Sequence, residues 1–268
     1  MRGANRHHSA SLLDPEADCR AKSPAMINPP FATVQEAFFY CRDMDASLSE
    51  RLETFSNVAR ALKPDLQEAV DRMVARLKQN RAGEAAPKPG EKMPAFTLPD
   101  ETGKLVNLET LLEGGPLAVT FHRGHWCPYC RINTRALSEA QAKIRALGAQ
   151  LVAIVPERQQ FAASFKSDAG LDYPMLTDLD NGYALSLNLA IWVGAELEAL
   201  MADSGRNLPQ YQGNEAWFLP IPATFVLAAD GTIMARFLDP DYRKRMTVED
   251  LFTTLRLAQK CGRTGRET

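Results

Sequence analysis

Two cysteines stand close together in the segment Cys127-Pro128-Tyr129-Cys130. An apolar run ends shortly before them and apolar residues at helical spacing follow, so the pair is expected at the start of a helix. Free backbone N–H groups and the positive end of the helix dipole stabilise a thiolate there and lower its pKa. Cys130 lies one turn further along the same face, where a disulfide with Cys127 needs little backbone movement. The spacing therefore indicates a redox-active dithiol.

The two thiols are expected to do different work. Cys127 is expected to be exposed at the tip of the helix and to be the attacking sulfur, whereas the more sheltered Cys130 resolves. An oxidant would convert Cys127 to a sulfenic acid, with which Cys130 condenses. An external thiol donor would then reset the pair. Pro128 suits the first helical turn, because its missing N–H would have no helical partner there.

Other interpretations of the pair are a zinc site, a haem attachment site and two inert core cysteines. His122 and His125 are nearby, but the chain offers no second pair of ligands of the kind that zinc sites use. Haem attachment needs a histidine directly after the second cysteine, where this chain has Arg131. We therefore expect no metal and no cofactor, while inert buried cysteines stay open.

Three residues before the pair are further candidates for the site. Arg123 is either a solvated charge at the end of a strand, or a donor that stabilises the Cys127 thiolate and holds an oxidant's oxygen. His125 is either a proton carrier or a surface histidine. Trp126 is expected to form a hydrophobic lid over the thiols.

The composition narrows the setting. The 268 residues have a net charge of −2 and no long basic run, which argues against nucleic acid or an anionic membrane as partner. Five cysteines, mostly scattered, are typical of a reducing compartment rather than of a secreted disulfide framework. The beginning of the chain lacks the apolar core of a secretory signal, and no apolar run approaches a membrane span. We expect a cytoplasmic protein.

The first third of the chain divides into three parts. Residues 1–30 are polar without periodicity, which predicts a disordered tail. Residues 31–82 carry apolar side chains at spacings of mostly three and four, which predicts a helical arm, with Pro64 beginning one of its helices. Residues 83–90 form a Gly/Pro/Ala-rich linker. The arm is expected to pack on the following domain or on a second subunit, so a homodimer stays open.

Residues 91–262 alternate between strand and helix patterns, and residues 263–268 are a short tail. Strands are expected at 94–99, 116–122, 150–155, 174–176, 223–227 and 232–238, the last two as a hairpin around Asp230-Gly231. Helices are expected at 127–147, 159–167, 184–203 and 248–258, and a polar loop at 204–220. This order predicts an α/β domain with a central mixed sheet flanked by helices.

From about Gly90 onwards, four segments in order carry a resemblance: PGEKMPAFTLPDETG, FHRGHWCPYC, LGAQLVAIVPE and LPIPATFVLAADG. With them the chain resembles the peroxiredoxin-like branch of the alkyl hydroperoxide reductase/thiol-specific antioxidant family. The resemblance implies a thioredoxin-like fold, here with an N-terminal helical extension. It also implies reduction of hydrogen peroxide and organic hydroperoxides to water and alcohols. The peroxidatic cysteine maps onto Cys127 and the resolving one onto Cys130, with thioredoxin or a similar dithiol as reductant.

The chain also departs from this family's pattern. The family carries Pro seven residues and Thr or Ser three residues before the peroxidatic cysteine, where this chain has Thr120 and Gly124. It carries Arg at the start of the late strand, where Pro222 instead resembles the cis-proline that faces the Cys-x-x-Cys of thioredoxins. Arg123 is therefore expected to replace the missing groups. The candidate substrate-binding residues are His125, Trp126, Pro128, Pro222 and Thr224.

The sequence is thus compatible with three functions. The leading hypothesis is a thiol peroxidase. The second is a general thiol–disulfide oxidoreductase, which Pro222 and the Cys-x-x-Cys spacing favour. The third is a non-catalytic, redox-sensing interaction module, for which the helical arm is the argument.

Overall fold

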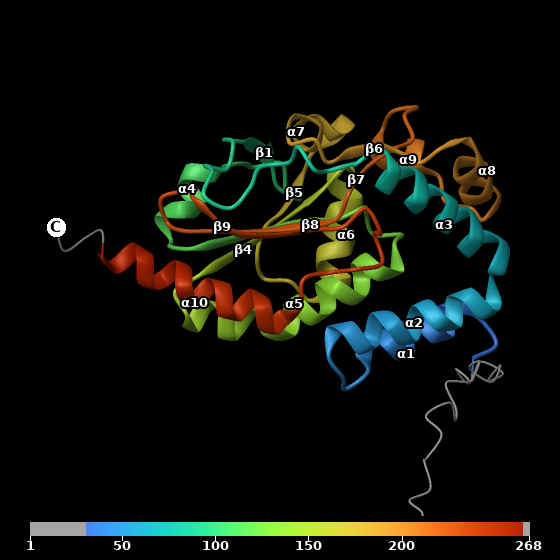
Figure 1. Cartoon of the computed structure of the whole chain (residues 1–268), viewed down its shortest axis with the longest axis horizontal. Helices are drawn as coiled ribbons and strands as arrows, with labels where there is room; N and C mark the ends of the chain where they lie inside the picture. The colour runs from blue at the N-terminus through green and yellow to red at the C-terminus, as the bar shows by residue number, and fades with distance from the viewer. Residues whose placement is uncertain (1–30, 265–268) are drawn as a thin grey trace, which may run out of the picture. The chain divides into compact units, whose positions relative to one another are not determined.

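The computed structural model describes residues 31–264, with side chains from 31 to 260. The predicted disordered tail, residues 1–30, lies outside the described residues, and so does the side chain of Cys261. The fold is built around a five-stranded sheet with the strand order β5-β4-β3-β8-β9 (Figure 1). Its strands are β3 (Leu117–Phe121), β4 (Gln150–Val155), β5 (Met175–Thr177), β8 (Ala223–Leu227) and β9 (Ile233–Leu238).

The sheet is mixed. β3, β4 and β5 run parallel, whereas β8 is antiparallel to both β3 and β9. Central strand β3 is buried on both faces, as its unbroken apolar pattern predicts. Parallel strands need crossover connections, and helices provide them here. The predicted α/β fold with a central mixed sheet is confirmed, as is the hairpin of β8 and β9 around Asp230-Gly231.

Helices cover both faces of the sheet. One face packs against α5 (Pro128–Ala146), α6 (Gln159–Ala169) and α10 (Val248–Thr264). The other face packs against α4 (Leu108–Glu113) and α7 (Gly182–Ser186), beside the hairpin of β1 (Thr97–Pro99) and β2 (Leu105–Asn107). Neighbouring residues of β3 serve opposite faces, since Ala118 contacts the first layer while Leu117 and Val119 contact the second.

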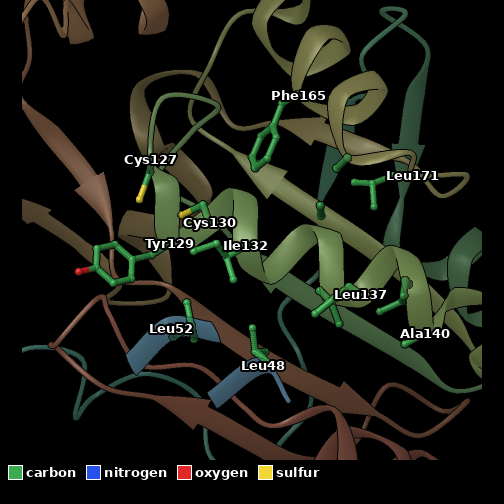
Figure 2. Close-up of a cluster of buried hydrophobic side chains, with 14 of the residues drawn as sticks. Leu48, Leu52, Cys127, Tyr129, Cys130, Ile132, Leu137, Ala140, Phe165 and Leu171 are labelled. Atoms are coloured by element: carbon green, nitrogen blue, oxygen red, sulfur yellow. The ribbon is translucent and has the colours of Figure 1, made fainter. Parts of the chain in front are cut away.

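Helices also form the expected arm: α1 (Val34–Asp43), α2 (Leu48–Leu62) and α3 (Pro64–Gln79). A reciprocal capping box between Ser47 and Glu50 begins α2, and Pro64 occupies the first turn of α3. The apolar stripes of α1 and α2 pack against α5, as Figure 2 shows for Leu48 and Leu52 beside the dithiol helix. Helix α3 packs against α8 (Ala195–Asp203). The stripes are therefore covered by the following domain of the same chain.

The predictions for residues 184–220 are wrong in part. The expected helix at 184–203 is divided into α7 and α8 by strand β6 (Ala190–Trp192), and the expected loop contains α9 (Leu208–Gln212) and β7 (Phe218–Pro220). A 3-10 turn, Leu179–Asn181, precedes α7, and β6 pairs with β7 in a small antiparallel sheet. Asn188 at φ 58° and Gly194 at φ 96° interrupt the helix, because positive φ is incompatible with a right-handed helical turn. No helix within residues 31–264 combines the length and apolar character that a membrane crossing requires.

The packing of the arm on α5 can be tested through Phe55. Its ring is 1% exposed and meets the Tyr129 ring edge to face, with 5.1 Å between centroids. We expect Phe55→Ala to lower the free energy of unfolding by about 3 to 5 kcal/mol in urea titrations, because it leaves a cavity between two helices. The control Phe39→Ala removes a ring of the same arm that is 42% exposed, and it should change that free energy by about 0.5 kcal/mol. Equal losses for the two variants would contradict the packing.

Candidate active site

The dithiol lies at the junction between strand β3 and helix α5. Cys127 is the N-cap residue of α5 and Pro128 is its first helical residue, as the sequence predicted. The Cys127 N–H donates to the carbonyl of Gly124 at 3.2 Å, which closes a tight turn between strand and helix. Gly124 has φ 137°, a conformation that favours glycine. The turn thus places Cys127 at the positive end of the helix dipole.

A buried carboxylate holds this turn. Glu157 follows β4 and has no exposed surface. Its Oε2 accepts a hydrogen bond from the His125 backbone N–H at 2.8 Å, and its Oε1 pairs with His125 Nδ1 at 2.7 Å. A Cβ on residue 124 would lie 2.5 Å from Glu157 Oε1, so only glycine fits here. Glu157 was not among the residues predicted from the sequence, although its place at the carboxyl end of a strand parallel to β3 was a usable signal.

Both sulfurs are buried, so the prediction of an exposed Cys127 is wrong: the arm and the loop after β9 cover the start of α5. Cys127 is 1% exposed, Cys130 is fully covered, and both are free thiols (Figure 2). Cys130 Sγ accepts hydrogen bonds from the Arg123 backbone N–H at 3.3 Å and from Arg245 Nη2 at 3.4 Å. Two donors therefore converge on the inner sulfur of the pair.

The two thiols differ strongly in acidity. Burial by itself raises the pKa of Cys127, but the hydrogen bond from the Cys130 thiol, the charges of Arg123 and Arg245 and the Cys130 backbone N–H outweigh it and lower this pKa to about 6. Burial, the hydrogen bond to Cys127 and the Cys127 charge raise the pKa of Cys130 to about 12. At neutral pH the pair therefore holds a thiolate on Cys127 and a proton on Cys130.

Arg123 is not a solvated charge. It is 4% exposed, and its guanidinium carbon lies 3.7 Å from the ring centroid of Tyr242 and 5.1 Å from that of Trp126. Cation–π contacts of this kind hold a guanidinium in a fixed place. The solvated alternative is therefore wrong. The geometry fits the other interpretation, in which Arg123 stabilises the Cys127 thiolate.

A second arginine was missed in the sequence. Arg245 is buried in the loop between β9 and α10, where it donates to Cys130 and to the carbonyls of Tyr242 and Lys244. It is far from the dithiol along the chain, and only the fold brings it there. The run of basic residues 243–245 was visible in the sequence, but nothing local shows which of them turns inward.

Cys127 faces a cavity of about 730 Å³. Site residues Arg123, Trp126, Pro128 and Tyr242 line one side of it, while α2, α3 and α8 supply the others. Cys130 is not among the lining residues, so Cys127 is the sulfur that a small molecule meets first. The arm is thus a wall of the space above the dithiol.

Three predicted substrate-binding residues lie elsewhere. Among the described residues, the lining of the cavity does not include His125, Pro222 or Thr224. The His125 ring is stacked on Phe161 with 5.0 Å between centroids and is held by Glu157. Thr224 is paired with Thr120 across β8 and β3, and the Ile221–Pro222 peptide is trans, so the resemblance to a thioredoxin cis-proline does not extend to this bond.

The acidity of Cys127 can be measured directly. The ultraviolet absorbance of the thiolate in the reduced protein should rise with pH around a midpoint of about 6, because the charged form is stabilised. We expect Arg123→Met and Arg245→Met each to move that midpoint upward, toward the ordinary thiol value of about 8.5. Cys127→Ser should remove the transition. A wild-type midpoint at the ordinary value would contradict the assignment.

The part of the chain that carries the dithiol is similar to known proteins. The family model described as Redoxin matches residues 88–255 of the chain. Over 92 residues the chain is 33% identical to a Mycobacterium tuberculosis protein provisionally named a peroxiredoxin, which covers 34% of this chain and 58% of that one. Over 94 residues it is 27% identical to the peroxiredoxin Bcp of Escherichia coli K12, covering 35% and 60% of the two chains.

Among solved structures, peroxidoxin BcpB of Mycobacterium tuberculosis is similar with a TM-score of 0.49 and 21% identity, over 63% of this chain and 97% of that one. The chain covers less than two thirds of each of the two relatives compared by sequence. The family match contains the dithiol, Arg123, Glu157, Arg245 and the whole central sheet, but not the arm. Because the Redoxin model matches more than half of the chain, the chain belongs to the redoxin family.

Proposed function

We propose that this protein is a thiol peroxidase in which Cys127 is the peroxidatic cysteine and Cys130 resolves. The observation that carries the proposal is a buried thiolate with a pKa of about 6, flanked by two buried guanidinium groups and facing a cavity. The peroxiredoxin relatives support the same reaction class.

In the first step the Cys127 thiolate attacks the terminal oxygen of a hydroperoxide. The S–O bond forms as the O–O bond breaks, Cys127 becomes a sulfenic acid, and the departing alkoxide takes a proton from water to become an alcohol. Negative charge develops on that departing oxygen, and fixed donors aimed at it lower the barrier. The Arg123 guanidinium and the N–H groups at the start of α5 are the donors beside Cys127.

In the second step the Cys130 thiol condenses with the sulfenic acid. A disulfide forms, and the hydroxyl of the sulfenic acid leaves with the Cys130 proton as water. An external dithiol such as thioredoxin then reduces the disulfide and is itself oxidised. Its thiolate attacks Cys127, the sulfur on the cavity side. This cycle implies a reducing compartment, which we take to be the cytoplasm.

The roles of the two cysteines can be distinguished by substitution. Cys127→Ser should not turn over peroxide with any dithiol, because the attacking sulfur is gone. Cys130→Ser should consume about one equivalent of peroxide per chain and stop as a sulfenic acid, which dimedone labels and mass spectrometry locates. Cys41→Ser is the matched control, since it removes another buried thiol, and it should behave as wild type. Normal turnover by Cys127→Ser would overturn the proposal.

Arg123 distinguishes a peroxidase from a general thiol–disulfide oxidoreductase. Arg123→Met should slow oxidation of Cys127 by hydrogen peroxide at least about tenfold, a loss of about 1.4 kcal/mol of transition-state stabilisation. Exchange of the Cys127–Cys130 disulfide with a small dithiol should change much less, because no oxygen has to be held. Both second-order rates are measured on the same preparation by stopped flow. Equal slowing of both reactions would favour the oxidoreductase instead.

A further inference from the structure

The cavity above Cys127 is far larger than hydrogen peroxide requires. Its volume of about 730 Å³ falls within the range of sites that enclose whole organic ligands, about 300 to 1,000 Å³. Most of the side chains that face it are apolar. On the arm and α8 they include Phe55, Ala59, Leu62, Val70, Leu200 and Met201. Hydrogen peroxide is small and strongly hydrated, so contact with this apolar lining does not favour its binding.

Resting on the peroxidase function proposed above, we propose that this chamber binds the organic part of the substrate. The substrate is a hydroperoxide with a bulky apolar body, and α2, α3 and α8 select it. Helix α8 lies inside the part of the chain that the family model matches, whereas α2 and α3 lie outside it, so two of these three walls are an addition to the redoxin fold. The apolar body leaves water as it enters the chamber, which favours binding with the hydroperoxide group at Cys127.

One polar side chain in the chamber points to a bound partner. Gln67, in the first turn of α3, lines the chamber and is 5% exposed, yet its Oε1 is buried with no hydrogen-bond partner. An unpaired buried acceptor is unfavourable, and native proteins leave few of them. A hydroperoxide or its alcohol product carries one O–H donor beside the apolar body. We infer that Gln67 accepts a hydrogen bond from the occupant of the chamber.

The exposed polar residues of the lining mark where the chamber opens. Lys63, Asp65 and Asp203 line the chamber with exposed side chains, so the chamber meets solvent between α3 and α8. A substrate can enter there although Cys127 itself is buried. The charges at this opening are of both signs, so they favour neither an anionic nor a cationic substrate. An uncharged apolar hydroperoxide is compatible with the opening and with the apolar walls.

The test compares hydrogen peroxide with cumene hydroperoxide on the full chain. The second-order rate of Cys127 oxidation by each is measured in stopped flow, and wild type should react faster with cumene hydroperoxide. Leu200→Trp and Ala59→Phe fill the chamber from α8 and from α2. Each should lower the ratio of the cumene rate to the hydrogen peroxide rate at least about tenfold, since shape exclusion in an apolar pocket acts at this scale. The matched controls Ala199→Trp and Ala61→Phe add the same bulk at exposed positions of the same helices and should leave both rates unchanged.

Gln67→Leu separates a ligand contact from a structural role. Removing an unpaired buried acceptor should leave the melting temperature equal or higher, whereas binding of cumyl alcohol, followed by tryptophan fluorescence, should weaken several-fold. A lower melting temperature with unchanged alcohol binding would overturn the assignment of Gln67.

The outcomes are distinguishable. Equal rates with the two peroxides in wild type, unaffected by the filling variants, would overturn the chamber as a substrate site. Filling variants that slow only reduction of the disulfide by a dithiol would assign the chamber to the reductant and also overturn the inference. If neither peroxide oxidises Cys127 of wild type, the proposed function itself fails, and this inference fails with it.

Discussion

A negatively charged sulfur that is almost sealed from solvent has to be neutralised from within the protein, and this constraint organises the site. Burial disfavours the charged form of Cys127, so the thiolate exists only because stronger stabilising groups surround it. Two of them are guanidinium groups that are buried as well. They in turn need fixed partners, which are the Tyr242 ring for Arg123 and the loop carbonyls of Tyr242 and Lys244 for Arg245. The acidity of one thiol therefore depends on the loop between β9 and α10.

The arm completes this arrangement from the outside. Without α1 and α2, the apolar face of α5 that carries Tyr129 would be exposed beside the dithiol. With them, Cys127 is buried, and charges interact more strongly in a buried place than in solvent. Asp71 of α3 also pairs with Arg243 at 2.8 Å, which ties the arm to the loop that carries Arg245. Substrate space and thiolate stabilisation thus share the same covering elements.

The sequence predicted what local patterns encode. The unbroken apolar runs gave β3 and β4, and the Cys-Pro step gave the start of α5 with Cys127 as its N-cap. Arg245, Glu157 and Gln67 could not be found in this way, because their importance comes from contacts between segments that are distant in the chain. The helix expected at 184–203 failed for a backbone reason, since the positive φ of Asn188 leaves no mark in the apolar periodicity. The wall that the arm forms above Cys127 was likewise invisible, because periodicity predicts a covered face but not what covers it.

Gly124 restricts how this site can change in evolution. In the family that the chain resembles, a Thr or Ser occupies this position, three residues before the peroxidatic cysteine. Here a Cβ would collide with the Glu157 carboxylate, and the backbone has a φ of 137°. Restoring the hydroxyl would therefore require the Glu157 side chain to move, which would break its hydrogen bonds with His125. No single substitution leads back to the common form of the pocket. With Glu157 in this turn, stabilisation of the Cys127 thiolate is left to Arg123, Arg245 and the Cys130 hydrogen bonds.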